Sequence, residues 1–106
     1  MASYVVCLTT VNSRRVAERI GKQLVKRRLI ACAGLIPSLT SFYHWKGRLC
    51  RDREVLLLIK TKRSLLVRLQ KVIHDLHPYE LPEFVVLPIT GGSKRYLAWI
   101  GEQVKG

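Results

Sequence analysis

The sequence predicts an α+β fold, in which an antiparallel sheet carries its helices on one face. The first observation is a central segment that reads as two long apolar strands meeting at a Lys46-Gly47 turn. The second is the order of the patterns, because strand-like and helical segments follow one another as β-α-β-β-α-β-α. Two split βαβ units in this order form a ferredoxin-like sandwich, and the seventh element is an extra C-terminal helix. We expect a single domain over residues 1–106.

The two central strands, residues 31–45 and 48–61, are too long for their own domain to cover. Each holds about 15 residues and could reach about 45–50 Å at ~3.3 Å per residue. A chain of this size should have a radius of gyration of only ~13 Å. We therefore expect the hairpin to bend, break or project, and Pro37 to supply one break, because proline cannot donate to a sheet ladder. A projecting ribbon needs a partner, and a second copy of the chain is the simplest one.

The first strand and helix follow from local patterns. Residues 3–11 are rich in β-branched and aromatic side chains, and Asn12-Ser13 is suited to capping a helix. The helix should run to about Arg28, and within it Glu18 is expected to pair with Lys22. Gly21 predicts close packing of this helix on the sheet. The apolar stripe consists of Val16, Ala17, Ile20, Leu24 and Val25.

The second half of the chain repeats this alternation. Ser64 is expected to cap a helix over residues 65–76, which ends at His77-Pro78 because a residue before proline avoids the helical conformation. Residues 84–89 read as a short apolar strand, and Ser93 is expected to cap the final helix. One face of the sheet would stay uncovered in a monomer, which again favours an oligomer.

The composition favours a soluble intracellular protein. No apolar run approaches the ~18–20 residues of a membrane span, and the N-terminus lacks the pattern of a signal peptide. The three cysteines, Cys7, Cys32 and Cys50, are odd in number and form no CxxC pair. This usage fits a reducing cytosol better than a disulfide framework, so we expect a cytoplasmic protein.

The chain is strongly basic, with a formal net charge of +12 and a pI near 10.3. Such a balance permits attraction to polyanions, but a basic face that is simply solvated is the favoured interpretation. Sheets that bind nucleic acid interleave aromatic and basic side chains on one exposed strand face. Tyr43 and Trp45 share a face, but they do not alternate in the required repeat with Lys46 and Arg48. Nucleic-acid binding is therefore a candidate that the sequence does not favour.

Short motifs lie along nearly the whole chain. They are Leu29-Ile30-Ala31-Cys32, Leu35-Ile36-Pro37, Ser41-Phe42-Tyr43-His44-Trp45-Lys46-Gly47, Glu54-Val55-Leu56, Lys60-Thr61, Leu76-His77-Pro78-Tyr79-Glu80, Pro82-Glu83 and Tyr96-Leu97-Ala98-Trp99-Ile100. In sequence, order and spacing they resemble the CutA family, the divalent-cation tolerance proteins. The resemblance implies a ferredoxin-like protomer, a homotrimer interlocked through extended hairpins, and a role in tolerance of copper and other divalent metals.

The resemblance also bears on where a metal ion would bind. In copper-binding bacterial members, the site uses a cysteine of the first strand and a pair of histidines before the Pro-Tyr. The matching positions here are Thr9, Leu76 and His77, so two of those three ligands are replaced. Cys7 shares a strand face with Thr9 and could substitute for it. We therefore expect Cu²⁺ or another divalent metal to bind weakly, with no organic cofactor.

The candidate metal ligands are His77, Glu80 and Cys32. His77 lies at a helix exit beside a proline with Glu80 close by, and imidazole suits Cu²⁺ or Zn²⁺. The alternative for His77 is a structural role at the carboxyl end of the helix, where a cation is favourable. Cys32 is in the Ala-Cys segment of the family motif, and its alternative is that of a small buried hydrophobe. Cys50, among basic side chains, is the thiol expected to be most reactive.

Four aromatic residues, Tyr43, Trp45, Tyr79 and Trp99, are expected to contact neighbouring subunits of the trimer. The tryptophans are interpreted as packing anchors rather than as platforms for nucleic-acid bases. The His77–Glu83 motif either fixes a turn against a neighbouring subunit or forms part of a cleft for a small ligand or metal. No nucleophile, second catalytic carboxylate or phosphate-cradling loop accompanies Glu80, so we do not expect an enzyme.

The sequence thus predicts a trimeric cytoplasmic protein that binds copper or other divalent metal ions and takes part in the response to metal. An alternative from a different class is a trimeric scaffold or signalling protein, whose intersubunit clefts hold a small ligand or another protein. A third candidate is a polyanion binder that uses the basic surface, including Arg27 and Arg28.

Overall fold

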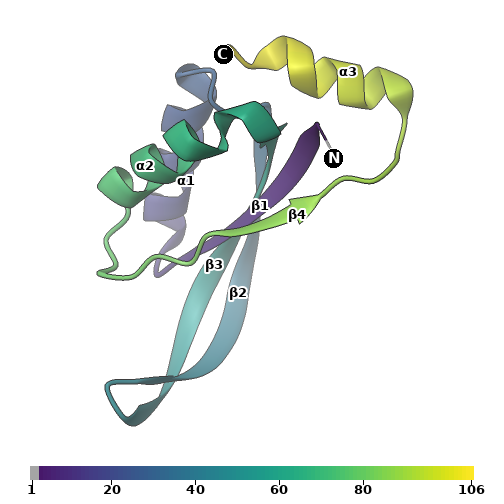
Figure 1. Ribbon diagram of the computed structural model, residues 1–106. Helices are drawn as coiled ribbons and strands as arrows, with labels where there is room; N and C mark the ends of the chain where they lie inside the picture. Colours follow the sequence, from purple (N-terminus) through teal and green to yellow (C-terminus); the bar gives the residue numbers. More distant parts are fainter. Residues whose placement is uncertain (1–2) are drawn as a thin grey trace.

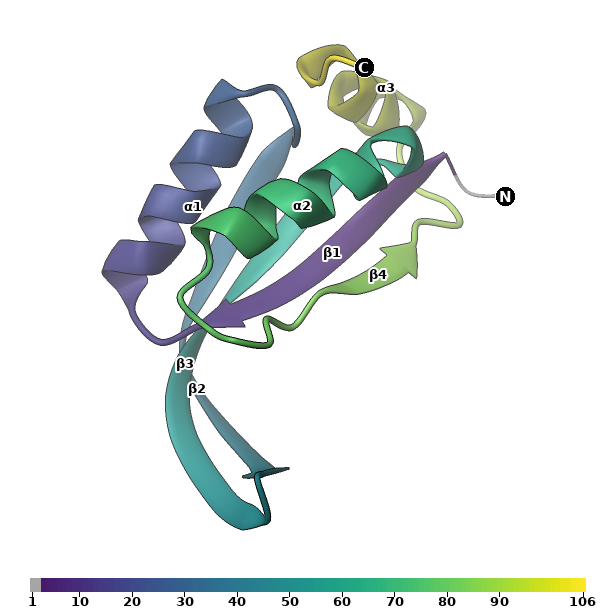
Figure 2. The same cartoon turned by 60° about the vertical axis from the view of Figure 1, so that its left-hand side comes forward.

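The computed structural model describes residues 3–106 of the chain. The elements are β1 (Tyr4–Val11), α1 (Arg14–Lys26), β2 (Cys32–Trp45), β3 (Arg48–Lys62), the 3₁₀ turn η1 (Arg63–Leu65), α2 (Leu66–Leu76), β4 (Val85–Pro88) and α3 (Lys94–Gln103). The strands form one antiparallel sheet in the order β2-β3-β1-β4. Helices α1 and α2 cover one face of it, and α3 lies across one end (Figures 1 and 2). The predicted α+β, ferredoxin-like sandwich with an extra C-terminal helix is confirmed.

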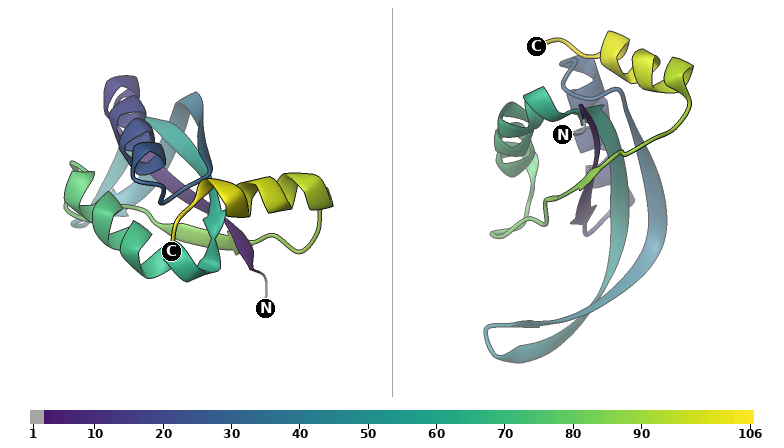
Figure 3. Two further views of the ribbon diagram at one scale, coloured as in Figure 1. Left: turned by 90° about the horizontal axis from the view of Figure 1, so that it is seen from above. Right: turned by 45° about the vertical axis from the view of Figure 1, so that its right-hand side comes forward.

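Strands β2 and β3 form a long projecting hairpin, as predicted. They pair from Cys32 opposite Lys60 to Trp45 opposite Arg48. The turn holds Lys46 at a φ of 51° and Gly47 at a φ of 77°, which are the left-handed conformations that a type I′ turn requires. The far half of the hairpin extends beyond the helices and curves (Figure 3). The longest dimension of the molecule is accordingly 44 Å.

Pro37 interrupts the pairing of β2 with β3, as predicted, but it does not end the strand. Because β2 is an edge strand, one of its sides makes no ladder hydrogen bonds, and a residue without an N–H group is tolerated there. The register instead shifts between Ile36 and Leu39, where Ser38 takes a φ of 64°. The strand continues through this point as a β-bulge that accommodates one extra residue.

The bulge decides which aromatic side chains share a face of the sheet. Successive side chains of a strand point to opposite faces of the sheet. One extra residue therefore reverses, for the rest of the strand, which side chains point to which face. Ile36 lies opposite Leu56 before the bulge, and Tyr43 lies opposite Cys50 after it. Both partners on β3 have even numbers and share a face. Tyr43 and Trp45 therefore continue the face of Ile36, which is the face that α1 and α2 leave free.

The main core lies between the sheet and helices α1 and α2. A second, smaller cluster packs α3 against the end of the sheet through Ala31, Leu65, Ile100 and Val104. The fully buried side chains of the main core include Val5, Cys7, Val11, Ala17, Ile20, Leu24, Leu57, Ile59 and Leu69. No helix within residues 3–106 combines the length and the apolar character needed to cross a membrane.

The opposite face of the sheet is also apolar but is not covered by a helix layer. We call it the bare face; it comprises Val6, Leu8, Ile36, Leu56, Leu58, Val85 and Leu87. Ile36, Val85 and Leu87 are 45%, 43% and 46% exposed, respectively. An antiparallel sheet with one solvated face normally alternates apolar and polar side chains, so an apolar second face marks a surface that requires a cover.

Two of the three predicted helix caps are confirmed. The Ser13 hydroxyl accepts a hydrogen bond from the Val16 N–H, and the Ser93 hydroxyl accepts one from the Tyr96 N–H. The prediction for Ser64 was wrong, because this residue lies inside η1 and α2 begins after Leu65 without a side-chain cap. The buried Leu65 side chain anchors this entry instead, as part of the cluster beneath α3.

The predicted pair between Glu18 and Lys22 was also wrong. Glu18 forms its ion pair with Arg14, at 3.6 Å between the carboxylate and Nε. Helical side chains point towards the N-terminus of their helix, so the Glu18 carboxylate lies over the preceding turn. Both side chains are exposed, and we attribute little stability to the pair.

Replacing Gly21 by alanine should stabilise the protein by about 1 kcal/mol, because glycine in a helix interior is unfavourable relative to alanine. A Cβ at this position would meet the Ala33 Cβ at 3.5 Å, an ordinary contact. Gly101→Ala is the matched control in α3, where a Cβ would meet the Tyr4 hydroxyl at 3.1 Å. Urea unfolding of both variants measures the difference, and an equal gain for both would contradict the packing described for Gly101.

Candidate functional site

A cavity of about 1000 Å³ lies where the hairpin faces the segment that joins α2 to β4. We call it the hairpin cavity. It combines aromatic and acidic side chains from the outer half of the hairpin and from the segment before β4, and the end of β1 adds the polar Thr10. Its lining includes Thr10, Tyr43, Trp45, Asp52, Glu54, Tyr79, Glu80, Glu83 and Phe84.

The hairpin cavity gathers most of the acidic side chains of a basic protein. Asp52, Glu54, Glu80 and Glu83 line it together with a single cation, Arg53, whereas the whole chain has only seven Asp and Glu residues and a net charge of +12. Burial raises the pKa of Glu83, and the nearby Glu54 carboxylate raises it further. The cavity is therefore a place where added positive charge would relieve repulsion between carboxylates.

Glu54 and Tyr79 form the innermost pair of the cavity. The Tyr79 hydroxyl donates a hydrogen bond of 2.7 Å to Glu54 Oε2, and the Glu54 residue is only 7% exposed. Burial, followed by the Glu54 carboxylate, raises the pKa of Tyr79, so the phenol stays protonated and continues to donate. This bond satisfies a buried carboxylate and holds the loop against β3.

His77 uses both ring nitrogens within the chain. Its Nδ1 accepts a hydrogen bond from the Tyr79 N–H at 3.1 Å, so the proton is on Nε2, which donates to the Thr10 carbonyl at 2.8 Å. Burial lowers the pKa of His77, which favours the neutral ring. This geometry supports the structural alternative, although the ring binds β1 rather than the carbonyls at the end of α2.

The three residues predicted as metal ligands do not lie together in one chain. Glu80 lines the hairpin cavity with an exposed side chain, and His77 lies in the same loop. Cys32 is at the start of β2, where its sulfur lies 3.9 Å from the Tyr96 hydroxyl of α3. Across residues 3–106, no three side chains of His, Cys, Asp or Glu group closely enough to hold a metal ion.

The other two cysteines occupy different environments. Cys7 shares the buried, helix-covered face of β1 with Thr9, as the alternation predicted. Burial raises the pKa of Cys7 to about 11, so its thiol is protonated near neutral pH. Cys50 is on the hairpin, where its thiol lies 3.7 Å from the Arg48 carbonyl.

Three of the four predicted subunit-contact residues surround the hairpin cavity. Tyr43 donates a hydrogen bond from its hydroxyl to the Asp52 carboxylate, and Trp45 and Tyr79 also line the cavity. Trp99 lies elsewhere, stacked on Tyr96 of α3 with ring centroids 5.5 Å apart. Tyr43, Trp45 and Trp99 are 38–39% exposed, so each keeps apolar surface available for a further contact.

Asp52 and Glu54 are cavity residues that the sequence analysis did not select. A signal was available, because both continue at a spacing of two residues the face of Leu56 and Leu58. Where acidic residues replace apolar ones on the same face of a strand, the apolar surface ends and a polar site begins. The partners of these acids could not be inferred, since Tyr79 is 25 positions away from Glu54.

Comparison with known proteins decides the family. The family model described as CutA1 divalent ion tolerance protein matches residues 5–103. The chain belongs to this family. The Divalent-cation tolerance protein CutA of Thermus thermophilus is 46% identical over 97 residues, which cover 92% of this chain and 94% of that protein. A solved structure of the T. thermophilus protein has a TM-score of 0.94 and 44% identity, and covers 96% of this chain and 99% of that one.

Eukaryotic relatives in the CutA1 family are longer. The Arabidopsis thaliana protein named "Protein CutA, chloroplastic" is 40% identical over 96 residues, which cover 91% of this chain but 53% of that protein. The chain therefore spans about half the length of this plant relative. It corresponds in length to the T. thermophilus protein.

Protonation of His77 should lower the stability of the fold. Its pKa is lowered in the folded state, so the unfolded chain binds the proton more readily, and stability is lost as the pH falls below the ordinary value of 6.5. The loss cannot exceed about 1.4 kcal/mol per pH unit. Urea unfolding at pH 7.5 and pH 5.5 measures it, and His77→Gln should reduce the dependence.

His74→Gln is the control for this prediction. His74 is exposed on the last turn of the same helix, and its charge is the smallest of the causes that shift the pKa of His77. Its replacement should therefore change the pH dependence of the free energy of unfolding much less than His77→Gln does. A pH dependence that survives His77→Gln intact would show that the buried ring is not its source.

Proposed function

We propose that this CutA1-family protein acts in divalent-cation tolerance as a cytoplasmic homotrimer that binds divalent metal ions weakly and has no catalytic turnover. The observation that carries the proposal is the collection of four carboxylates around one cavity in a chain of net charge +12. Oxygen ligands of this kind suit hard divalent ions, and Cu²⁺ binds most oxygen and nitrogen sites more tightly than other divalent ions of its series. The three free cysteines support a reducing compartment.

The proposal places the metal near Glu80 and Glu83 at the open side of the hairpin cavity. Glu54 is already held by Tyr79, and His77 would have to release the Thr10 carbonyl before it could bind a metal. Cys32 could contribute only from another copy, because it lies at the start of β2 beside α3. Because one chain supplies few ligands, the metal should bind it weakly. Assembly could strengthen the binding by adding ligands from another copy.

Assembly is supported by two surfaces that a single copy leaves open. One is the bare face, whose apolar side chains are up to 46% exposed. The other is the outer half of the hairpin, which carries the partly exposed Tyr43 and Trp45 on the same side as the bare face. Burial of both surfaces against copies of the chain would remove apolar surface from water. Each Å² removed would stabilise the assembly by about 25 cal/mol.

The protein should sediment at three times its chain mass of 12.2 kDa at micromolar concentration. Ile36→Lys places a charge on the bare face and should shift the population towards monomer. Val67→Lys is the matched control, because Val67 is 87% exposed on α2, away from the bare face. A wild-type chain that sediments as a stable monomer would overturn the proposed assembly.

Isothermal titration should detect weak binding of Cu²⁺ that depends on the carboxylates of the hairpin cavity. Glu83→Gln removes one negative charge from the cavity and should weaken Cu²⁺ binding about ten-fold, which corresponds to about 1.4 kcal/mol. Glu102→Gln removes an exposed carboxylate of α3, outside the cavity lining, and should leave binding unchanged.

Either of two results would reject the metal proposal. One is the absence of heat at millimolar Cu²⁺, and the other is an equal loss of affinity in the two glutamate variants. Both would favour the scaffold alternative, in which the clefts of the assembly receive a small ligand or another protein. The sedimentation result is independent of this outcome.

A further inference from the structure

Helix α1 and the two residues after it carry half of the net charge of the protein. Residues 14–28 contain seven basic side chains and one acid, against a total net charge of +12. The single acid, Glu18, is paired with Arg14. Four of the remaining six acids of the chain line the hairpin cavity. The basic side chains of α1 are therefore not neutralised by acids of their own segment.

Four of these basic side chains are exposed and make no hydrogen bond or ion pair with any part of the chain that the structure describes. They are Arg15, Lys22, Lys26 and Arg27. Two other arginines of the segment have structural partners. Arg19 donates to the Leu76 carbonyl at 3.4 Å, and Arg28 donates to the Gln103 carbonyl at 3.2 Å. The four unpaired cations gain nothing from the fold and are available to a partner.

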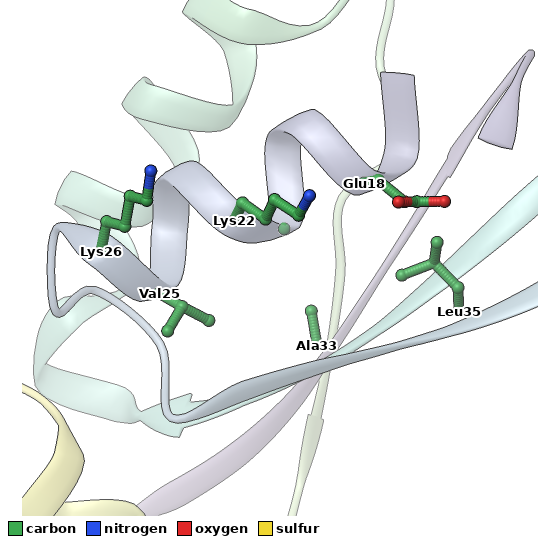
Figure 4. A pocket seen from close by; sticks show the side chains of 7 residues that line it. Glu18, Lys22, Val25, Lys26, Ala33 and Leu35 are labelled. Carbon is green, nitrogen blue, oxygen red and sulfur yellow. The ribbon is translucent and has the colours of Figure 1, made fainter. Parts of the chain in front are cut away.

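The unpaired cations form an extended surface. On an α-helix, Arg15, Lys22 and Lys26 fall within a narrow stripe about 16 Å long, and Arg27 follows at its end. We call these four side chains the α1 basic surface. Figure 4 shows Lys22 and Lys26 extending from α1, next to a cavity of about 380 Å³ that Ala33 and Leu35 of β2 also line. A duplex presents about ten phosphate charges over the same length.

The residues in and around this surface indicate which kind of polyanion it suits. A helix that binds a membrane surface inserts an apolar face, but Ala17, Ile20 and Leu24 on the apolar face of α1 are fully buried in the core. Single-stranded nucleic acids are held by stacking on aromatic side chains, and α1 contains none. The adjoining cavity is lined by the aliphatic side chains of Val25, Ala33 and Leu35, and its polar side chains, Glu18, Lys22 and Lys26, all come from α1. It lacks the Asn and Gln side chains that pair with adenine in the major groove, so it offers little basis for sequence preference.

We propose that the α1 basic surface binds the phosphate backbone of duplex nucleic acid without sequence preference. This function is separate from the proposed metal binding, because none of its four side chains lines the hairpin cavity. The contacts are charge-assisted hydrogen bonds from exposed Lys and Arg side chains to phosphate oxygens, with release of counterions from the duplex.

The test is fluorescence anisotropy with a labelled DNA duplex of about 20 base pairs, titrated with the full chain between about 50 and 300 mM NaCl. The logarithm of the affinity should fall linearly with the logarithm of the salt concentration. The triple variant Lys22→Gln, Lys26→Gln, Arg27→Gln should weaken binding at least about ten-fold and flatten the slope by about 0.9 for each phosphate that the variant no longer neutralises. A second duplex of unrelated sequence should bind equally.

The matched control is Arg48→Gln, Lys94→Gln, Arg95→Gln, which removes the same charge from exposed positions outside α1. It should retain most of the affinity and the slope. Three results would overturn the proposal: no binding of the duplex at the lowest salt concentration, an equal loss of affinity in both triple variants, or binding to vesicles of phosphatidylserine and phosphatidylcholine without binding to the duplex. Circular dichroism of each variant confirms that the fold is kept.

Discussion

The structure depends on the pairing of the edge strand β2 with β3, which runs from Cys32 opposite Lys60 to the turn of the hairpin with one bulge on the way. In its inner half, β3 is covered by α1 and α2 and supplies Val55, Leu57 and Ile59 to the core. In its outer half, the same ladder continues without a core beneath it. The outer hairpin is therefore held together by hydrogen bonds and cross-strand pairs rather than by burial.

The bulge at Pro37 and Ser38 links this ribbon to the candidate site. It turns Tyr43 and Trp45 to the face on which Asp52 and Glu54 lie, and the segment after α2 closes the other side of the cavity. His77 and Tyr79 fix that segment through hydrogen bonds to the Thr10 carbonyl and the Glu54 carboxylate. The motif around His77 thus works as a clamp between a loop and two strands, and the exposed acids beside it are left for a ligand.

Charge is sorted within the molecule rather than spread over it. Carboxylates gather around the hairpin cavity, where partial burial raises the pKa of Glu83, whereas unpaired cations line the solvent side of α1. A protein with a uniform basic surface would repel cations everywhere and would attract polyanions without a preferred face. The sorting allows one small chain to present an acidic cavity and a basic helix surface, each suited to a ligand of opposite charge.

Local periodicity was sufficient to predict the type and order of the elements, the caps at Ser13 and Ser93, and a hairpin that extends beyond the rest of the domain. Each of these features depends on residues that are neighbours in the sequence. The family could likewise be inferred from motifs in the chain. Three contacts could not be inferred in this way, because they join residues 25 to 67 positions apart. They are the bond between Tyr79 and Glu54, the bond from His77 to the Thr10 carbonyl, and the contact of Cys32 with Tyr96. Strand register and the bulge set those contacts, and a shift of one residue would have placed other side chains in the cavity. Residue patterns thus specify the elements, and packing between distant segments specifies the site.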